Sequence, residues 1–420
     1  MVGLGAHNRR AKDPGQSVRL DTGAHRRAGA DRRAGGCLVT EALLKRRPLP
    51  NWWVRFVESH PTVPTVIAVT GLALIMFMLA PTVGHQSQNG ELIDSLARVV
   101  RSHTIVSKAV GLRAAYHNAV PEEIRDYAGA ILFTPVLYFV VPFFLLLEYL
   151  FPCDPSQPLI GKGFLQDAIW FAAAAPTTIL VLGAVSKFLR GLYDKHLAFL
   201  TIRSAATWPT FVQVIAALFL VEFLFWFSHF TRHKVRTLWL FHAVHHSQKE
   251  LNVFTDDRSH VVDKLAGSLL MFVPFYVFQV PNLYAVATIG LYLSIHSRFV
   301  HLNVKINLGW LGWLVASPQF HRVHHSVESA HWDKNFAGVL SIFDYLFGTA
   351  CPSRDIYPDT GIADAQFPGE GNSGLLGLPG NWFKQNAFPF VQLFRELAPR
   401  PSPSPEQQTA LSSSRISTQH

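Results

Sequence analysis

Residues 210–248 read TFVQVIAALFLVEFLFWFSHFTRHKVRTLWLFHAVHHSQ, an apolar run that passes directly into a dense group of histidines. The apolar part, residues 210–230, is long enough to cross a bilayer as a helix, which needs about 20 residues. Five histidines then lie between His229 and His246. We therefore expect the chain to leave a membrane helix and to gather imidazole side chains at the membrane surface.

The composition of the whole chain also favours a membrane protein. Hydrophobic residues make up 49% of the 420 residues, whereas charged residues make up only 15%. Such a chain needs an apolar solvent for part of its surface, and we predict an all-α, multi-span helical membrane protein. Besides residues 210–230, the predicted spans are residues 62–83, 130–151 and 166–186, and residues 265–280 and 283–295 are expected to form a helical hairpin that enters the membrane and returns.

The distribution of positive charge predicts the orientation. The net charge is +9, and much of the excess lies in residues 1–47. Basic segments beside a membrane helix stay in the cytoplasm, so we interpret residues 1–50 as a disordered cytoplasmic tail rather than a nucleic-acid-binding segment. Four spans and a returning hairpin then place all the clustered histidines in a helical, metal-binding cap on the cytoplasmic face. The expected location is an inner or cell membrane, or the endoplasmic reticulum.

We expect residues 51–350 to form one membrane-embedded domain, with its histidine-rich catalytic part at about residues 210–350. Residues 351–398 form a C-terminal extension, in which residues 381–397 are predicted to lie on the membrane surface. Residues 399–420 are rich in Pro and Ser and are predicted to be a disordered tail. The three cysteines lie far apart and form no CxxC motif, which argues against a disulfide framework or a cysteine-based metal site.

Twelve of the 20 histidines lie between His229 and His331, and their spacing is regular. One HxxxH pair and two HxxHH motifs repeat the offsets of three and four residues, which place side chains on one face of a helix. The eight histidines of these motifs are His229, His233, His242, His245, His246, His321, His324 and His325. Neutral imidazole is a good ligand for iron, zinc, copper and nickel.

Eight imidazoles exceed the coordination of one ion, so the sequence favours two ions. Zinc sites use three or four protein ligands, whereas two redox-active irons beside an apolar membrane could use O2 to oxidise a lipid C–H bond. Oxidation of this kind can yield an alcohol or, by loss of a second hydrogen, an alkene.

The motifs HFTRH, HAVHH and HRVHH, together with SRFVHLNV and DKNFAGVLSIFDYLFGT, resemble those of the fatty acid hydroxylase/sterol desaturase superfamily of integral-membrane di-iron oxygenases. The resemblance covers roughly residues 125–350. The stretch HLNVKINLGWLGWLVASPQFHRVHHS is especially similar to bacterial members and to alkylglycerol monooxygenases. The HxxxH spacing of the first motif favours this branch over the acyl-CoA desaturases, whose first motif usually reads HxxxxH.

The resemblance implies two iron ions, which could appear as zinc in purified protein, held by the eight histidines of the three motifs. It adds His301 as a ninth ligand and implies no catalytic side chain beyond the metal ligands. Further candidates for extra ligands or for groups that orient ligands are His260, His296, His331, Asp333 and Asn335, with Asp344 as a weaker candidate.

The leading functional hypothesis is a membrane di-iron oxygenase that hydroxylates a C–H bond of a lipid with O2 and external electrons. The lipid could be a sterol, a fatty acyl chain, an alkylglycerol or a carotenoid. A sterol or carotenoid desaturase or oxidase is the alternative within enzymes, and a non-catalytic metal- or lipid-binding membrane protein is the alternative outside them. Because the chain shows no flavin or haem motif, we expect an electron donor such as a ferredoxin or a cytochrome b5-like protein with its reductase.

Overall fold

The computed structural model describes residues 48–83, 136–280, 283–364, 366–370 and 374–398, and helices dominate these ranges. Within them, strand-type pairing is limited to two isolated bridges, Pro152 with Val304 and Ser326 with Thr360. The expected all-α class is confirmed for the described part of the chain. The predicted tail at residues 399–420, and all but the last three residues of the predicted tail at 1–50, lie outside the described residues.

The main helices differ widely in length, from five residues to 31. In chain order they are α2 (Asn51–Ser59), α3 (Val63–Val83), α7 (Val141–Leu150, preceded by one π-helical turn at Val136–Val140), α8 (Lys162–Leu192), α9 (Thr210–Lys234), α10 (Arg236–His246), α11 (Val261–Ser268), α12 (Val273–Val277), α13 (Leu283–Val300), α14 (Pro318–His324), α15 (Ile342–Leu346) and α16 (Leu378–Leu397).

Helices α3, α7, α8 and α9 occupy the positions of the four predicted spans. Helix α9 is long and apolar enough to cross a membrane, with a mean hydropathy of 2.1, and it is the one helix in the described ranges that meets both conditions. Two shorter apolar segments, Val63–Ile75 and Tyr138–Leu150, lie in α3 and at α7. By length and composition alone, the structure therefore supports one crossing directly.

The predicted hairpin differs from expectation in its first arm. Residues 265–280 do not form one helix, because α11 ends at Ser268 and the chain starts a separate short helix with Pro274 in its first turn. Proline lacks the backbone N–H that would continue a helix and is tolerated best at a helix start, which explains the break. The second arm is helical throughout Leu283–Val300, and the predicted turn at residues 281–282 lies outside the described residues.

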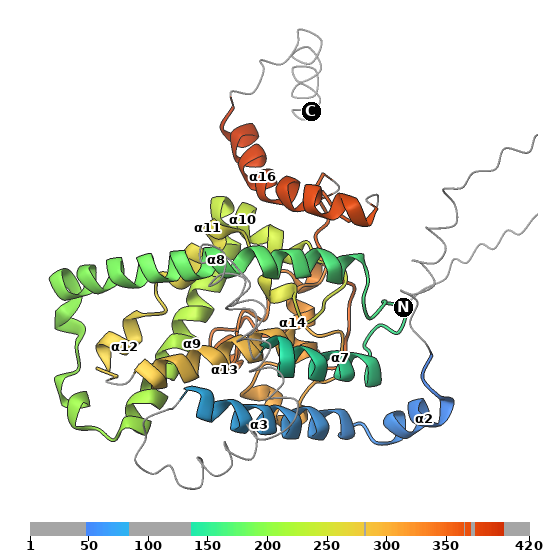
Figure 1. The fold of residues 1–420 in the computed structure, drawn as a ribbon, viewed down its shortest axis with the longest axis horizontal. Helices are drawn as coiled ribbons and strands as arrows, with labels where there is room; N and C mark the ends of the chain where they lie inside the picture. The colour runs from blue at the N-terminus through green and yellow to red at the C-terminus, as the bar shows by residue number, and fades with distance from the viewer. Residues whose placement is uncertain (1–47, 84–135, 281–282, 365, 371–373, 399–420) are drawn as a thin grey trace, which may run out of the picture. The chain divides into compact units, whose positions relative to one another are not determined.

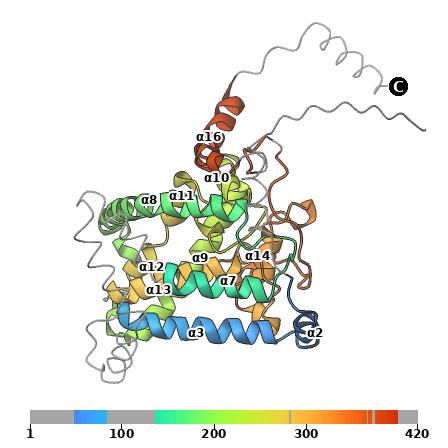
Figure 2. The same cartoon turned by 45° about the vertical axis from the view of Figure 1, so that its right-hand side comes forward.

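The helices that carry the histidine motifs pack against one another. Helix α9 contacts α10, α11 and α12, while α13 contacts α14 and α3. Helix α16 lies against α8 and α10 (Figures 1 and 2). The histidines at the ends of α9 and α10, directly after α13 and at α14 lie close together in this arrangement.

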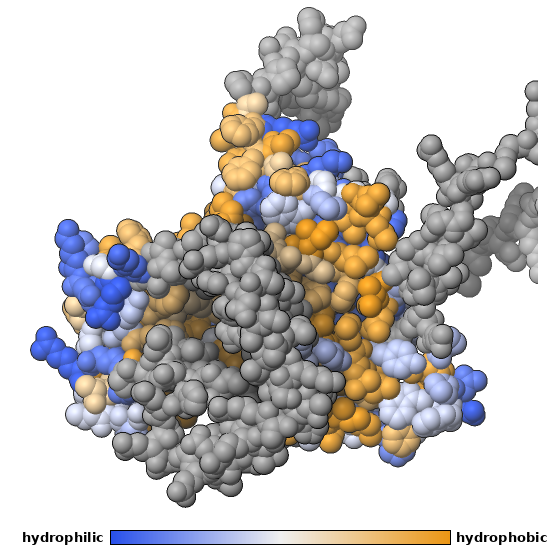
Figure 3. All heavy atoms as spheres, viewed as in Figure 1, coloured by the Kyte–Doolittle hydropathy of each residue, from blue (hydrophilic) through white to orange (hydrophobic). Residues whose placement is uncertain are grey.

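The outward faces of the apolar helices remain exposed. On α9, Phe211, Ile215 and Phe219 follow one another at intervals of four residues and are 66%, 62% and 52% exposed. Hydrophobic residues also gather on the surface around α3 and α7 and on the outer side of α16 (Figure 3). Contiguous apolar surface of this kind marks contact with a membrane or a partner.

Candidate metal centre

Four segments deliver the clustered histidines. His229 and His233 occupy the last two turns of α9, and the chain then turns at Val235, which has an extended backbone (φ −93°, ψ 111°) between two helices. Helix α10 contributes the second motif in its last turns, and α14 contributes the third. His301 follows directly after α13. The motif histidines of α9 and α10 therefore lie on helices, and in the third motif His325 follows α14 as its C-cap.

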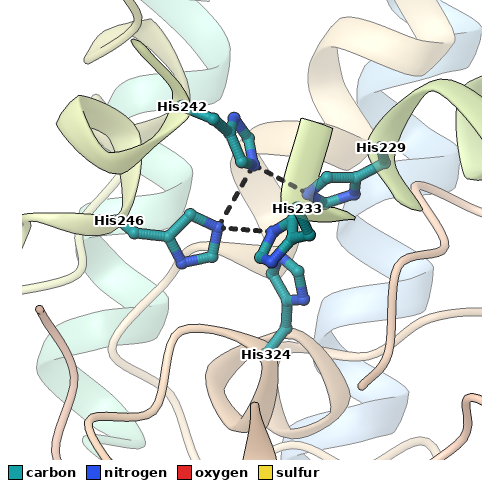
Figure 4. Close-up of side chains that lie close together, drawn as sticks. All are labelled: His229, His233, His242, His246 and His324. Carbon is teal, nitrogen blue, oxygen red and sulfur yellow. Dashed lines mark hydrogen bonds between the residues drawn. The ribbon is translucent and has the colours of Figure 1, made fainter. Parts of the chain in front are cut away.

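The nine histidines form two groups, in each of which the candidate ligand atoms all lie within 4.8 Å of one another. The five-histidine group comprises His229, His233, His242, His246 and His324 (Figure 4). The four-histidine group comprises His245, His301, His321 and His325. The two groups share the motifs, because each HxxHH motif contributes side chains to both.

In the five-histidine group, Nε2 atoms converge on one point. The Nε2 of His242 lies 3.0 Å from that of His229 and 3.2 Å from that of His246. The Nε2 of His246 lies 3.1 Å from that of His233 (Figure 4). His324 Nε2 is buried and has no hydrogen-bond partner among the described residues.

The four-histidine group repeats this arrangement. The Nε2 of His301 lies 2.9 Å from that of His321 and 3.2 Å from that of His245. The Nε2 of His325 lies 3.2 Å from that of His321. All four side chains are buried.

These distances fit a metal ion in each group. Imidazole nitrogens that each lie about 2.1 Å from one ion are about 3.0–3.4 Å apart in octahedral or tetrahedral geometry. Lone pairs facing each other at this distance in a buried site would otherwise repel, and buried polar atoms need partners. The donor set, its burial and its spacing therefore make both groups able to bind metal.

Several of the imidazole rings are fixed by hydrogen bonds from Nδ1, on the side away from Nε2, to backbone carbonyls. Nδ1 of His229 donates to the carbonyl of Phe336 at 2.7 Å, and Nδ1 of His324 donates to the carbonyl of Lys334 at 2.7 Å. Nδ1 of His301 donates to the carbonyl of Ser297 at 2.6 Å. A proton fixed on Nδ1 leaves the Nε2 lone pair for a metal, which is the usual arrangement around metal-binding histidines.

A buried carboxylate does the same for His242. Both oxygens of Asp263 lie 3.1 Å from His242 Nδ1, and both accept from Arg232 at 3.2 Å. Ser259 Oγ donates to the same carboxylate at 3.0 Å. Burial alone would raise the pKa of Asp263, but the neighbouring His242 and Arg232 lower it well below its usual range. His242 and Arg232 therefore favour the anionic form of Asp263, which orients His242.

Comparison with known protein families finds a family that matches the segment containing the histidine groups. Residues 214–349 match the family model described as fatty acid hydroxylase. Residues 214–349 are a fatty acid hydroxylase domain. All nine grouped histidines lie inside these limits.

Individual relatives agree with this assignment. Ornithine lipid hydroxylase OlsE of Rhizobium tropici is 35% identical over 210 residues, which is 50% of this chain and 60% of that protein. Alkylglycerol monooxygenase of Xenopus tropicalis is 30% identical over 258 residues, covering 60% of this chain and 55% of that protein. The human alkylglycerol monooxygenase is 35% identical over 129 residues, 31% of this chain and 28% of that protein. The chain thus spans between about a quarter and three fifths of these relatives, and no solved structure is significantly similar to it.

Burial changes the pKa values of the imidazoles in the fatty acid hydroxylase domain. It lowers the pKa of His245, His246, His321, His324 and His325 well below 6.5, and neighbouring imidazoles lower it further. These rings are therefore neutral at physiological pH. A neutral ring keeps the lone pair that a metal ligand needs.

The additional candidates in the hydroxylase domain have different surroundings. His260 accepts from the backbone N–H of Val262 as the cap of α11 and packs on Phe241, outside both histidine groups. Asp333, which is partly exposed, lies 3.7 Å from His233 Nδ1 and accepts from Lys234 at 2.6 Å.

The remaining candidates brace the surrounding backbone or lie apart. Asn335 links α14 to the C-terminal extension through the carbonyl of Phe320 and the N–H of Cys351. His331 bonds to the Ser326 hydroxyl, and His296 is buried in α13 outside both groups.

Asp344 has a stronger structural role than its sequence suggested. Its carboxylate accepts from Trp226 Nε1 at 3.0 Å and from the N–H groups of Phe336 and Ala337 at 2.9 and 2.8 Å. It accepts a further bond from Thr349 Oγ at 2.6 Å. Since the carbonyl of Phe336 holds His229, Asp344 fixes a ring of the five-histidine group through the backbone.

A second buried ionic network, which sequence reasoning missed, supports α10 from outside. Arg258 is fully buried and pairs with Asp167 of α8 and with Glu370 of the C-terminal extension. Asp167 also accepts from Asn252 at 2.9 Å and from Gln248. The sequence feature that could have revealed this network is Asp167, because a charged residue inside the apolar run 166–186 needs a buried partner.

Proposed function

We propose that the chain is an integral-membrane, O2-dependent lipid hydroxylase that uses two iron ions. The observation that carries the proposal is the convergence of nine buried imidazoles into two groups at the end of the apolar helix α9, inside a fatty acid hydroxylase domain. One ion would be held by the five-histidine group and the other by the four-histidine group. Iron, when bound, supplies the activation of O2 and the oxidation of a C–H bond.

The protein contributes orientation and exclusion of water. Three backbone carbonyls and Asp263 fix the rings that would bind metal, so little rearrangement is needed when an ion enters. Burial of the four-histidine group keeps bulk water from that ion. Asp333 at the edge of the five-histidine group interacts with both His233 and Lys234, and we assign it to the orientation of His233.

The reaction needs electrons from outside the chain. One oxygen atom of O2 is inserted into the C–H bond, and the other leaves as water after it accepts two electrons and two protons. We assign the electrons to a separate ferredoxin or cytochrome b5-like donor with its reductase. The protons reach the site from the aqueous side.

We place the domain in a membrane with α3, α7, α8 and α9 as spans and with the histidine groups at the cytoplasmic face. The exposed apolar faces of α9, α3 and α7 support this arrangement, as does the basic segment at residues 1–47. Residues 51–350 form the membrane-embedded unit, and residues 351–398 an extension that packs against it through α16.

The substrate is a lipid. Among the relatives, one is named an ornithine lipid hydroxylase and others alkylglycerol monooxygenases, so oxygen insertion is favoured over desaturation. Ligands for two ions, with orienting partners in both groups, favour a catalyst over an inert binding protein.

Metal analysis tests the proposal. Full-length protein purified from iron-supplemented cells should contain close to two iron ions per chain. The double variant His246→Ala/His325→Ala, which removes one ring from each group, should lose most of this iron, whereas His60→Ala, at the exposed residue directly after α2, should keep it. Well-folded protein without bound metal after iron reconstitution would contradict the proposal.

A further inference from the structure

A cavity of about 450 Å³ opens beside the five-histidine group and reaches it directly. His233, His246 and His324 form one side of the cavity, and the view in Figure 4 shows these three rings on the same side of the group. The volume lies in the ordinary range of small-molecule sites. The four-histidine group contributes no residue to its lining.

The lining carries balanced charge. The lining includes two cations, Lys234 and Arg236, and two carboxylates, Asp333 and Asp364. Arg236 also pairs with the carboxylate of Glu396 on α16, which lies 3.0 Å from its Nε and which an acidic ligand group would have to replace. The Lys234 ammonium lies 2.6 Å from Asp333, and Asp364 accepts from the backbone N–H of Gln366 at 2.8 Å. A site with both signs of charge selects ligands that carry both signs.

The rest of the lining is apolar and aromatic. Trp239 packs on the rings of His233 and His246, with centroids 4.9 and 5.3 Å apart. Trp332, which is 56% exposed, and Phe388 of α16 complete this part of the wall. An amphiphile would therefore find charged partners and hydrocarbon contacts in the same cavity.

Helix α16 connects the cavity to an apolar surface. Phe388 and Gln392 line the cavity, and Phe390 packs on Phe241 of α10, whereas Phe383 and Phe394 are 67% and 73% exposed. A helix with one face on the protein and an apolar face outward is typical of a helix that lies in a membrane interface.

We propose that this cavity binds the zwitterionic head group of an amphiphilic substrate, with an ammonium group at Asp364 and an acidic group at Arg236. The assignment rests on the proposed hydroxylase function, because it takes the histidine-bearing side of the cavity as the reacting side. The head group enters from the lipid surface beneath α16. The aromatic wall holds the first atoms of the hydrocarbon chain.

Photoaffinity labelling tests the proposal without relying on turnover. Iron-loaded, full-length protein in nanodiscs is exposed to three single-chain probes with a diazirine beside the head group: lysophosphatidylethanolamine, lysophosphatidic acid and monoacylglycerol. The zwitterionic probe should label peptides from residues 326–334, 361–364 and 388–392, and it should bind most tightly of the three.

Two charge reversals in the cavity should then test the contact of the ammonium group and the contact of the acidic group independently. Asp364→Lys and Arg236→Glu should each weaken the zwitterionic probe about 5-fold or more and leave the neutral probe unchanged. With the anionic probe, Asp364→Lys should strengthen binding and Arg236→Glu should weaken it. The matched control is Asp359→Lys, which reverses an exposed charge outside the cavity.

Labelling confined to other peptides, or equal affinity for all three probes, would overturn the proposal. The proposal would also be overturned if the charge-reversal variants slowed reduction by the electron donor and left lipid binding unchanged. The cavity would then be the surface that binds the electron donor. Head-group binding in a protein that hydroxylates no lipid would refute the proposed function alone. Iron-dependent hydroxylation of a lipid that does not label the cavity would refute the head-group assignment alone.

Discussion

Replacing Asp263 with Asn should weaken one metal site and spare the other. The carboxylate contacts His242 Nδ1 at 3.1 Å and Arg232 at 3.2 Å, and all three groups are buried. Loss of a carboxylate behind a metal-binding imidazole typically costs about 10–100-fold in metal affinity. Asp263 contacts a ring of the five-histidine group, so the affinity should fall in that group only.

The same substitution should also destabilise the fold. Arg232 would keep its buried charge and lose its carboxylate, a change that costs about 3–5 kcal/mol in comparable buried pairs. The double variant Asp263→Asn/Arg232→Met should recover much of this stability, because it removes the uncompensated cation. It should not recover metal affinity, because His242 would still lack an anionic partner.

Titration with iron in competition with a chelator measures the effect. Wild-type protein should show two retained ions, and Asp263→Asn should retain about one at chelator concentrations that leave the wild type loaded. Asp194→Asn, which breaks an exposed ion pair with Arg190 on α8, serves as the matched control and should bind like the wild type. Two ions retained with unchanged affinity in Asp263→Asn would refute the orienting role, and so would equal loss from both groups in a folded protein.

Three further predictions concern other parts of the site. His324→Ala should abolish hydroxylated product while the protein remains in the membrane fraction, as measured by mass spectrometry of lipids and by fractionation; unchanged product would remove His324 from the site. Asp344→Asn should lower the unfolding midpoint by several degrees, because one amide cannot accept the four hydrogen bonds of the carboxylate, and an unchanged midpoint would contradict that role. Arg258→Met should leave Asp167 and Glu370 uncompensated and cost about 3–5 kcal/mol, detected as faster proteolysis around residues 366–398; wild-type resistance would show that the network does not hold the extension.

The histidine groups could be predicted from the sequence because their spacing is local. Offsets of three and four residues fix which rings share a helical face, and the family resemblance added His301 from outside the three motifs. How the rings divide between the two groups was not predictable. His245 and His246 are adjacent in sequence yet belong to different groups, since their directions depend on how α10 packs against α9, α11 and α16.

The supporting carboxylates were harder to find. Asp263 lies 21 positions from His242, and Asp344 lies 118 positions from Trp226, so no local pattern connects either pair. Helix lengths were predicted best where apolar runs are continuous, as in α9. They were predicted worst at residues 265–280, where Pro274 starts a new helix and overrides the apolar pattern.

The most direct test of the central claim is isotopic. Membranes that contain the full-length protein, a reducing system and a mixed lipid extract are incubated under 18O2, and the lipids are compared with those from the His246→Ala/His325→Ala variant. The account predicts a lipid that gains one 18O atom only with the wild-type protein. Loss of two hydrogens without gain of 18O would contradict hydroxylation, and no change in any lipid from iron-loaded protein would contradict the proposed activity.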